Sequence, residues 1–541
     1  MPKPVRIKHS AVGVKANDHQ LHRLQAIGFT SALNPEEIKE IGNDSIVEVA
    51  DGVPTVDITL DRNQDGSMKT LALFANKCFN YGYVQVTPSG GMTVNISNDE
   101  YFIDECRYVF SGGTATLAAP SSNNCIVVLS LTKNGTLAIT SGTSGVNPTP
   151  PTTPTSNLKI AEIYLSSGQT TIENKHILNC HDYITITEKD FENASVDVIV
   201  GVKESGDAST TTDYITRTAY MENAFLSRLE FACNTGGAST ENMSAETDNR
   251  RWFLGNKRTI VDARAVGSGT TKTLSSMTVQ KELGSTPDPV QLKNGKYFLK
   301  VYLYDSTTGK YTTLKEVTTV SANDEFSYNS GTKTLTFNYS IPNTTTIIAR
   351  YAANVDLWCV FKKLPKPDKS HPDLPAVLNQ GQIEVYLSLL PPEQFSPSSS
   401  SMTLRVESCS VSLGLTRTAL NEIGHHLPYS RPLQMPIPVT VNLNTTASDL
   451  EELAKLCGIS LSSATELQLD DFIKNLYLYI YMYRENDVKR QEAPYKWQPY
   501  LKKIVLTDLS VTNDAFDLRV DANATQNWTL TCDNITVTGC R

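Results

Sequence analysis

The chain has 541 residues and a formal net charge of −9 at pH 7, with 48 basic and 57 acidic side chains. This length allows three or four domains, and the mild acidity excludes the basic surface that tight nucleic-acid binding requires. No long apolar run and no apolar segment behind the first residues occur, so we expect neither a membrane span nor a signal peptide. Ten cysteines are scattered without a CxxC pair, which favours free, buried thiols; later oxidation of some pairs is the alternative.

The first predicted unit begins with residues 1–80, in which one stretch recurs far along the chain. Residues 24–60 read LQAIGFTSALNPEEIKEIGN…VPTVDITL, and residues 406–443 read VESCSVSLGLTRTALNEIGH…PIPVTVNL. Adding 382 to the residue number places Gly42 on Gly424, and one further residue in the next loop keeps the following strands aligned. Alternating apolar residues predict strands with one buried face. Each glycine, free to adopt positive φ, predicts a short turn or bend at the EIG motif.

A helix is predicted after the second strand of each copy. Residues 67–78 (SMKTLALFANKC) place apolar side chains at helical spacing. The counterpart in the second copy opens with a capping box, formed by Ser448 and Glu451.

Residues 81–178 differ in composition from their surroundings. Gly, Ser, Thr and Asn are frequent, short apolar strands start near residues 125 and 160, and residues 146–154 form a proline-rich polar loop. The second copy has nothing comparable at this place. We interpret the segment as an all-β domain inserted into the first copy, because loop closure entropy rises only slowly with loop length.

Residues 179–265 complete the first copy. Residues 225–249 correspond to residues 510–534 at an offset of 285, which places Thr240 on Thr525. Two similar blocks in the same order indicate that a whole domain is duplicated, with the second copy in residues 380–541.

Two further segments separate the copies. Residues 266–362 contain short alternating strands at sandwich spacing and predict an Ig-like β domain. Residues 363–379 contain closely spaced prolines, which block helix and ladder hydrogen bonds and predict an extended linker.

The clearest strand of the second copy carries four tyrosines on one face. Its sequence LYLYIYMY places Tyr477, Tyr479, Tyr481 and Tyr483 opposite an apolar face. Tyrosines pack well while their hydroxyls stay hydrogen-bonded. We expect this face to form an interface between subunits; the alternative is packing under a loop of the same chain.

Catalytic and metal-binding patterns are missing from the sequence. It contains no GxSxG, HExxH, P-loop or Rossmann glycine motif. His425 and His426 are adjacent, and no Cys or carboxylate stands at ligand spacing from them. We therefore expect no enzyme activity, catalytic residue, cofactor or metal.

The repeated motifs resemble those of phage major tail tube proteins. The EIG turn occurs in both copies, residues 54–60 match a P-x-V-x-[VI]-x-[FL] strand, and residues 524–528 match a late [AG]-[TS]-[EQ]-x-[WF] strand. Their counterparts, residues 437–443 and 239–243, keep the later apolar alternation and the central T-[EQ]-N respectively but depart from the patterns at the terminal positions. The resemblance covers both copies, about half of the chain. The resemblance implies a mainly β protein with two tail-tube-type sandwich or barrel domains, each with a flanking helix, beside the inserted all-β domain and the Ig-like domain. It also implies a virion protein that self-assembles into stacked rings, with three duplicated subunits in each pseudo-hexameric ring.

The resemblance implies partners as well. These are further copies of the chain for ring closure and stacking, the tail terminator, tape measure and baseplate or tip proteins, and double-stranded DNA that passes without specific binding. Assembly would occur in the bacterial host cytoplasm, and the location would be the virion tail. The inserted domain is similar to small modules of phage fibres and baseplates; it is expected either to contact host surface glycans or to be a passive outer module.

The alternative function is a host-recognition or carbohydrate-binding tail protein, and a contractile-tail tube is a variant of the first interpretation. The duplication favours the tube, because a binding protein has no evident need for two ring-forming domains.

Overall fold

The computed structural model describes much of the chain between residues 8 and 540. It leaves out residues 1–7, 18, 34–35, 40–45, 51–53, 78–79, 104–105, 155, 206–216, 236, 255–257, 268, 280–285, 292–296, 306, 308–309, 355–376, 379, 396–405, 421–430, 447–475, 484–499, 518–524 and 541. Gly42, Gly424, the histidine pair, the second-copy helix and most of the linker therefore lie outside the described residues.

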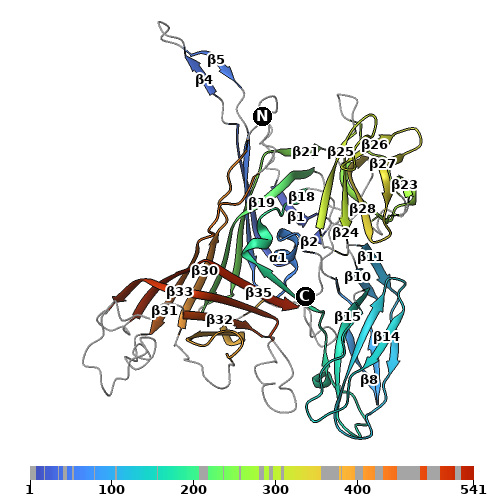
Figure 1. The fold of residues 1–541 in the computed structure, drawn as a ribbon, viewed down its shortest axis with the longest axis vertical. Helices are drawn as coiled ribbons and strands as arrows, with labels where there is room; N and C mark the ends of the chain where they lie inside the picture. Colours follow the sequence, from blue (N-terminus) through green and yellow to red (C-terminus); the bar gives the residue numbers. More distant parts are fainter. Residues whose placement is uncertain are drawn as a thin grey trace, which may run out of the picture.

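The protein is mainly β, with 62% of the described residues in strands and 5% in helices, as predicted. Its largest element is a layer of eight hydrogen-bonded strands, which we call the shared sheet (Figure 1). In spatial order its strands are β3 (Leu24–Ala32), β6 (Thr55–Asn63), β20 (Thr240–Thr247), β19 (Arg217–Asn234), β30 (Val406–Gly414), β31 (Val439–Thr446), β34 (Thr525–Cys532) and β33 (Lys502–Asp517).

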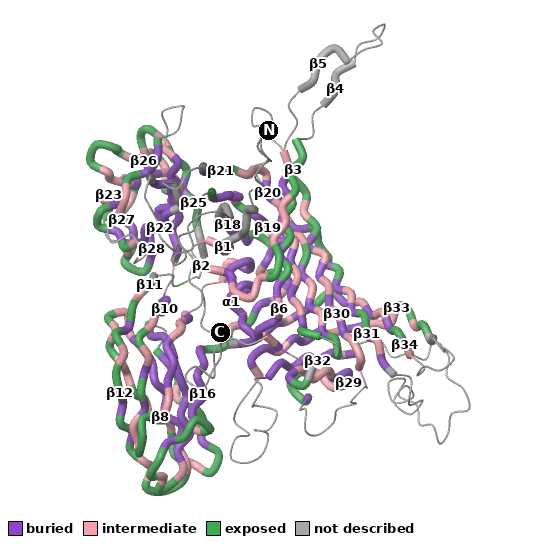
Figure 2. Tube along the Cα trace, turned by 180° about the vertical axis from the view of Figure 1, so that it is seen from behind, coloured by how far each residue is buried: buried purple, intermediate pink, exposed green. Residues whose placement is uncertain are grey.

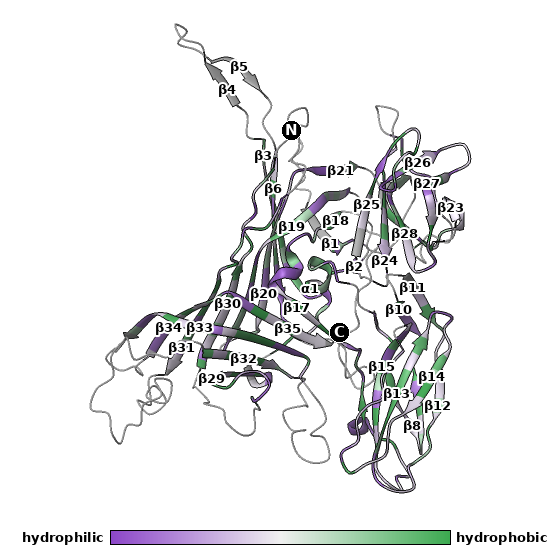
Figure 3. Ribbon diagram, in the orientation of Figure 1, coloured by the Kyte–Doolittle hydropathy of each residue, from purple (hydrophilic) through white to green (hydrophobic). Residues whose placement is uncertain are grey.

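Two outer sheets extend from the shared sheet, one for each copy. The first consists of β2 (His19–Gln20), β1 (Lys8–Ala16), β18 (Val196–Ser205), the first half of β19, and β21 (Arg250–Leu254). The second consists of β29 (Ile383–Ser388), β32 (Leu476–Met482), the first half of β33, β35 (Asn534–Cys540) and β17 (Tyr183–Thr187). One hydrophobic core includes buried residues of the shared sheet and both outer sheets, because alternation gives each strand one apolar face (Figure 3).

The two copies repeat each other in strand register. Thr240 is opposite Asn63 at the end of β20, and Thr525 is opposite Thr446 at the end of β34. The prediction that Thr240 and Thr525 occupy equivalent positions is confirmed. The β-bulges also recur: the irregularities in the β3–β6, β19–β20 and β18–β19 pairs have counterparts in β30–β31, β33–β34 and β32–β33. β17 departs from this plan, since it belongs to the first copy by sequence and pairs with β35 of the second.

A short helix, α1 (Lys69–Phe74), lies within the predicted helical stretch and is buried along its whole length. The 3₁₀ helices of the described residues are η1 (Asn174–His176), η2 (Glu188–Phe191), η3 (Leu274–Ser276) and η5 (Gln380–Gln382). No described helix is long and apolar enough to cross a membrane.

The predicted short turn of residues 37–42 begins as a strand, and its end at the EIG motif lies outside the described residues. There β4 (Glu36–Lys39) pairs with β5 (Ile46–Ala50), so the chain continues as a hairpin whose strands satisfy each other's backbone hydrogen bonds.

The inserted segment has a hydrophobic core of its own. Three small sheets enclose it: β11 (Cys106–Phe110), β10 (Asp99–Ile103) and β7 (Tyr81–Gly82); β12 (Gly113–Thr116), β9 (Thr93–Ile96) and β8 (Val86–Gly90); and β14 (Leu137–Ser141), β13 (Cys125–Thr132), β15 (Asn157–Leu165) and β16 (Ile177–Leu178).

Another β module precedes the linker. Its seven strands are β22 (Arg258–Val266), β28 (Thr345–Asn354), β24 (Leu299–Asp305), β25 (Lys310–Glu316), β26 (Glu325–Asn329), β27 (Thr334–Ile341) and β23 (Gly269–Thr273). Our boundary at residue 266 placed β22 in the first copy, but β22 pairs with β28 along its length, and Val261 and Ala263 lie in this module's core. This module and the inserted one lie on the same side of the shared sheet (Figures 1 and 2).

Candidate assembly surface

The face of the shared sheet that points away from the core is polar along the strands of both copies. We call it the polar face. Its residues are mainly Ser, Thr, Asn and Asp, and include Asp57, Thr59 and Asp61 of β6, Asn242 and Ser244 of β20, Ser410 and Ser412 of β30, Thr440 and Asn442 of β31, and Asn527 and Thr529 of β34. These side chains alternate with buried ones such as Ile58 and Leu60.

The charges on the polar face are mostly acidic and come from the first copy. Asp57 and Asp61 lie on β6. Glu230 on β19 forms an ion pair with Arg228 of the same face, at 3.0 Å. The strand of the second copy that corresponds to β6, β31, presents uncharged Thr and Asn there. Since Arg228 is neutralised by its neighbour, this arrangement gives phosphates little to bind.

The junction of the two copies is the antiparallel pair β19–β30. Leu229, Phe231 and Cys233 lie opposite Leu413, Val411 and Cys409, and all six side chains are buried. Just beyond, the Leu415 amide donates to the Ser227 carbonyl at 2.9 Å, and Leu415 is fully buried. The junction is therefore both hydrogen-bonded and closely packed.

Cysteines at this junction are free. Cys233 and Cys409 face each other across the two strands, and burial raises the pKa of the Cys233 thiol to about 11. Burial also raises the pKa of the Cys409 thiol well above its usual value, so both thiols stay protonated at neutral pH. All five cysteines whose state is described (Cys125, Cys180, Cys233, Cys409 and Cys532) are free and buried, in agreement with the expectation.

Both ends of the shared sheet have an open edge among the described strands. β3 pairs with β6 alone, and the second half of β33 pairs with β34 alone. By the offsets between copies, β3 corresponds to β30 and β33 corresponds to β19, the two strands that form the junction. The two open edges are thus the counterparts of a pair that already exists within the chain.

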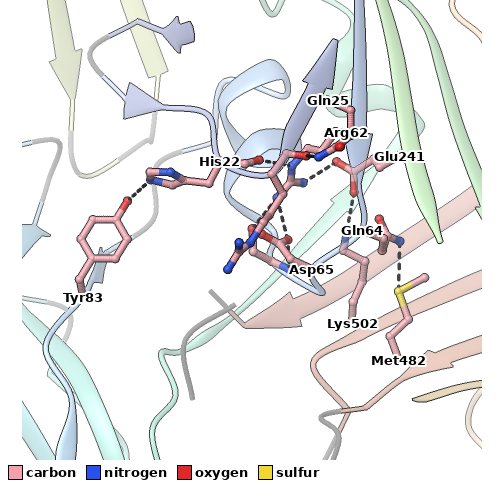
Figure 4. A network of polar contacts seen from close by, with 11 residues as sticks. His22, Gln25, Arg62, Gln64, Asp65, Tyr83, Glu241, Met482 and Lys502 are labelled. Carbon is pink, nitrogen blue, oxygen red and sulfur yellow. Dashed lines mark hydrogen bonds and ion pairs between the residues drawn. The ribbon is translucent and has the colours of Figure 1, made fainter. Parts of the chain in front are cut away.

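A buried network of charged side chains links β6 and β20 of the first copy with β33 of the second (Figure 4). Glu241 on β20 accepts from Arg62 on β6 at 3.1 Å and from Lys502 on β33 at 2.8 Å. Arg62 also donates to Asp65 at 2.6 Å and to the His22 carbonyl at 3.1 Å. Although burial opposes the charge on Arg62, Asp65 and Glu241 outweigh it and raise the pKa of the guanidinium. Two cations and two anions balance, as burial of charge requires.

We did not single out this network from the sequence, but a signal for it exists. Arg62 continues the buried alternation of Val56, Ile58 and Leu60, and Lys502 shares a face with Ile504. A charge on the apolar side of an alternating strand predicts a buried partner. In the second copy, Thr445 stands in the place of Arg62 and Gln526 in the place of Glu241. The charged network is therefore not repeated in the second copy.

The tyrosines of β32 are covered by their own chain, which is the alternative arrangement. Tyr479, Tyr481 and Tyr483 are buried and Tyr477 is half-buried. The ring of Phe395 stacks on Tyr479 with centroids 3.9 Å apart and planes 5° apart, and the Tyr479 hydroxyl donates to the Leu390 carbonyl at 2.7 Å. We therefore correct the expectation of an intersubunit interface on this face: the segment after β29 already covers it.

Replacing Phe395 with leucine is expected to destabilise the unassembled subunit by about 0.5–1.5 kcal/mol, the contribution of an aromatic pair beyond its buried area. Thermal unfolding of the unassembled protein measures this change. Unchanged monomer stability with weakened self-association would restore the interface interpretation.

The matching face of β18 is covered differently, by the module of residues 258–354. Asp197 accepts from Arg350 at 2.7 Å, from the Tyr302 hydroxyl at 2.8 Å and from the Tyr220 hydroxyl. Burial acts to raise the pKa of Asp197, but Lys300 and Arg350 together with these hydrogen bonds hold it well below its usual range. This carboxylate anchors the module to the first outer sheet.

Among the described residues, no group of three or more His, Cys, Asp or Glu side chains could hold a metal ion. Compared with protein-family models and with curated proteins, the sequence matches none. The edges and faces of the shared sheet are therefore the features from which function has to be inferred.

Proposed function

We propose that this protein is a structural subunit of a phage tail tube, without enzymatic activity, and that its copies close into rings through the open edges of the shared sheet. The observation that carries the proposal is the β19–β30 junction, whose counterparts β33 and β3 are left open at the two ends of the same sheet. Exposed strand edges that persist in a native protein are pairing sites unless they are blocked.

Strand number favours three copies in a ring. Three chains contribute 3 × 8 = 24 strands of the shared-sheet kind. At a strand spacing of about 4.8 Å the backbone diameter is about 37 Å, and side-chain layers of about 5 Å on each wall leave an opening of about 27 Å. Strand tilt widens it further. On the same calculation without tilt, two copies would leave about 14 Å, less than the summed depths of the two grooves of duplex DNA, about 16 Å.

The polar face suits the inner wall of such a ring. Acidic side chains repel phosphates and small uncharged side chains do not attract them, so DNA passes without being bound. The two β modules lie on the other side of the shared sheet (Figure 1), which would be the outer side of the proposed ring. This placement leaves the inserted module free to contact host surface glycans or to act as a passive outer module. The remaining proposed partners are the terminator, tape measure and baseplate or tip proteins, which would meet the ends of the tube.

Purified protein at rising concentration tests the proposal. We expect native mass spectrometry to show a species of three chains and negative-stain electron microscopy to show rings or tubes. A protein that stays monomeric at high concentration, and binds glycans with high affinity, would instead favour host recognition.

A further inference from the structure

We infer that β33 of one copy pairs antiparallel with β3 of the next copy, in the register of the chain-internal β19–β30 pair. The partner is a second copy of this chain, and the inference rests on the proposed ring. It fixes which residues meet, which the proposed function alone does not.

The register follows from the two offsets between the copies. Adding 285 to a β19 number gives its β33 counterpart, and subtracting 382 from a β30 number gives its β3 counterpart. The pair Glu230–Ser412 thus predicts Ala515 opposite Thr30. The pair Phe231–Val411 likewise predicts Phe516 opposite Phe29.

The β-bulges show that this transfer keeps the hydrogen-bonding pattern. The bulge between Leu226 and Arg228 of β19 recurs between Val511 and Asn513 of β33. The irregularity in the β3–β6 pair likewise recurs in β30–β31. Backbone donors and acceptors on the two open edges therefore alternate in the same phase as those of the existing junction.

Side chains beside the open edge of β3 are more exposed than their counterparts at the chain-internal junction. Leu415, at the chain-internal junction, is 0% exposed, whereas its counterpart Leu33, beside the open edge, is 75% exposed. Along β3, Phe29 is half-buried where its counterpart Val411 is fully buried. A large exposed apolar side chain at an open edge is what a missing strand would cover.

The two edges are also electrostatically compatible. β3 carries no charged residue and no proline, so nothing on it blocks pairing. The open half of β33 carries Asp514 and Asp517, which the register places opposite Ser31 and Gly28. No like charges meet across the pair.

Cysteine pairs test the register in the full-length protein. We expect the variant with both Thr30→Cys and Ala515→Cys to form covalent oligomers on mild oxidation with oxidised glutathione. The matched variant with Thr30→Cys and Asn513→Cys shifts one partner by two residues on the same face. Its Cβ atoms would lie about 7–8 Å apart instead of about 5 Å, so we expect it to give less than about a tenth of the product. The parent protein, treated identically, reports the background from native cysteines.

A substitution that needs no cross-link gives a second test. We expect Leu33→Asp to abolish rings while the thermal unfolding of the monomer stays unchanged. The control Val146→Asp changes another highly exposed apolar residue, 79% exposed in the inserted module, and should still form rings.

The outcomes separate the two proposals. Rings that form without in-register cross-links, or that survive Leu33→Asp, overturn the pairing inferred here and leave the tube proposal standing. A parent protein that never assembles overturns the tube proposal itself. Preferential cross-linking of the in-register pair, together with loss of rings in Leu33→Asp, supports the inference.

Discussion

Replacing Glu241 with glutamine is expected to lower the free energy of unfolding by about 3–5 kcal/mol, the usual cost of removing one partner from a buried ion pair. Glu241 and Lys502 are both 0% exposed, so the Lys502 ammonium would lose its carboxylate in a site that water does not reach. Arg62 would retain Asp65. Chemical denaturation followed by the intrinsic fluorescence of the four tryptophans, of which Trp528 is buried in the shared sheet, measures the change.

Two companion variants show whether charge is the cause. Glu230→Gln removes an acid from the polar face, where the pair with Arg228 is partly exposed, and should cost less than about 1 kcal/mol. Adding Lys502→Met to Glu241→Gln removes both charges and should recover much of the loss. An equal effect of the buried and exposed substitutions would contradict the role assigned to the network.

Replacing Asp197 with asparagine is expected to loosen the module of residues 258–354 and to cost about 3–5 kcal/mol at neutral pH. Asp197 is the carboxylate that Arg350 meets in a buried site, and two tyrosine hydroxyls donate to it. Limited proteolysis and thermal unfolding measure the effect. Asp57→Asn, on the polar face, is the matched control and should change little.

The difference in stability between the native protein and Asp197→Asn is expected to depend on pH. The pKa of Asp197 in the folded protein lies below its unfolded value, so its contribution is fully present above the unfolded pKa of about 3.9 and is lost as pH falls below it. The stability advantage of the native protein over Asp197→Asn should therefore be constant from neutral pH to about pH 5 and shrink toward pH 2. An advantage that grows on acidification would contradict the assignment.

The sequence was informative about strands and their repetition, because alternation depends on local side-chain order. It predicted the strand around Ile58 and the equivalence of Thr240 and Thr525. It did not predict that β17 pairs with β35 of the other copy, since a period of two residues says which face is buried and not which strand lies alongside.

The alternation of side chains also did not predict what covers the outward faces of the outer sheets. The tyrosines of β32 and the equivalent side of β18 both face away from the central core, yet Phe395 covers one and a whole β module covers the other. Phe395 stands in a proline-rich polar break, where no periodicity marks it as a core residue. The candidate assembly surface required the structure as well, because an open edge is defined by the strand that is missing.

The length of β19 has a mechanical consequence. Its 18 residues form one strand that passes, through β-bulges, from the first outer sheet into the shared sheet, and β33 does the same over 16 residues in the second copy. A force on one layer therefore reaches the other through covalent backbone and does not depend on side chains sliding past each other. Pulling along these strands would load many ladder hydrogen bonds at once, so we expect each copy to resist shear as one stiff body.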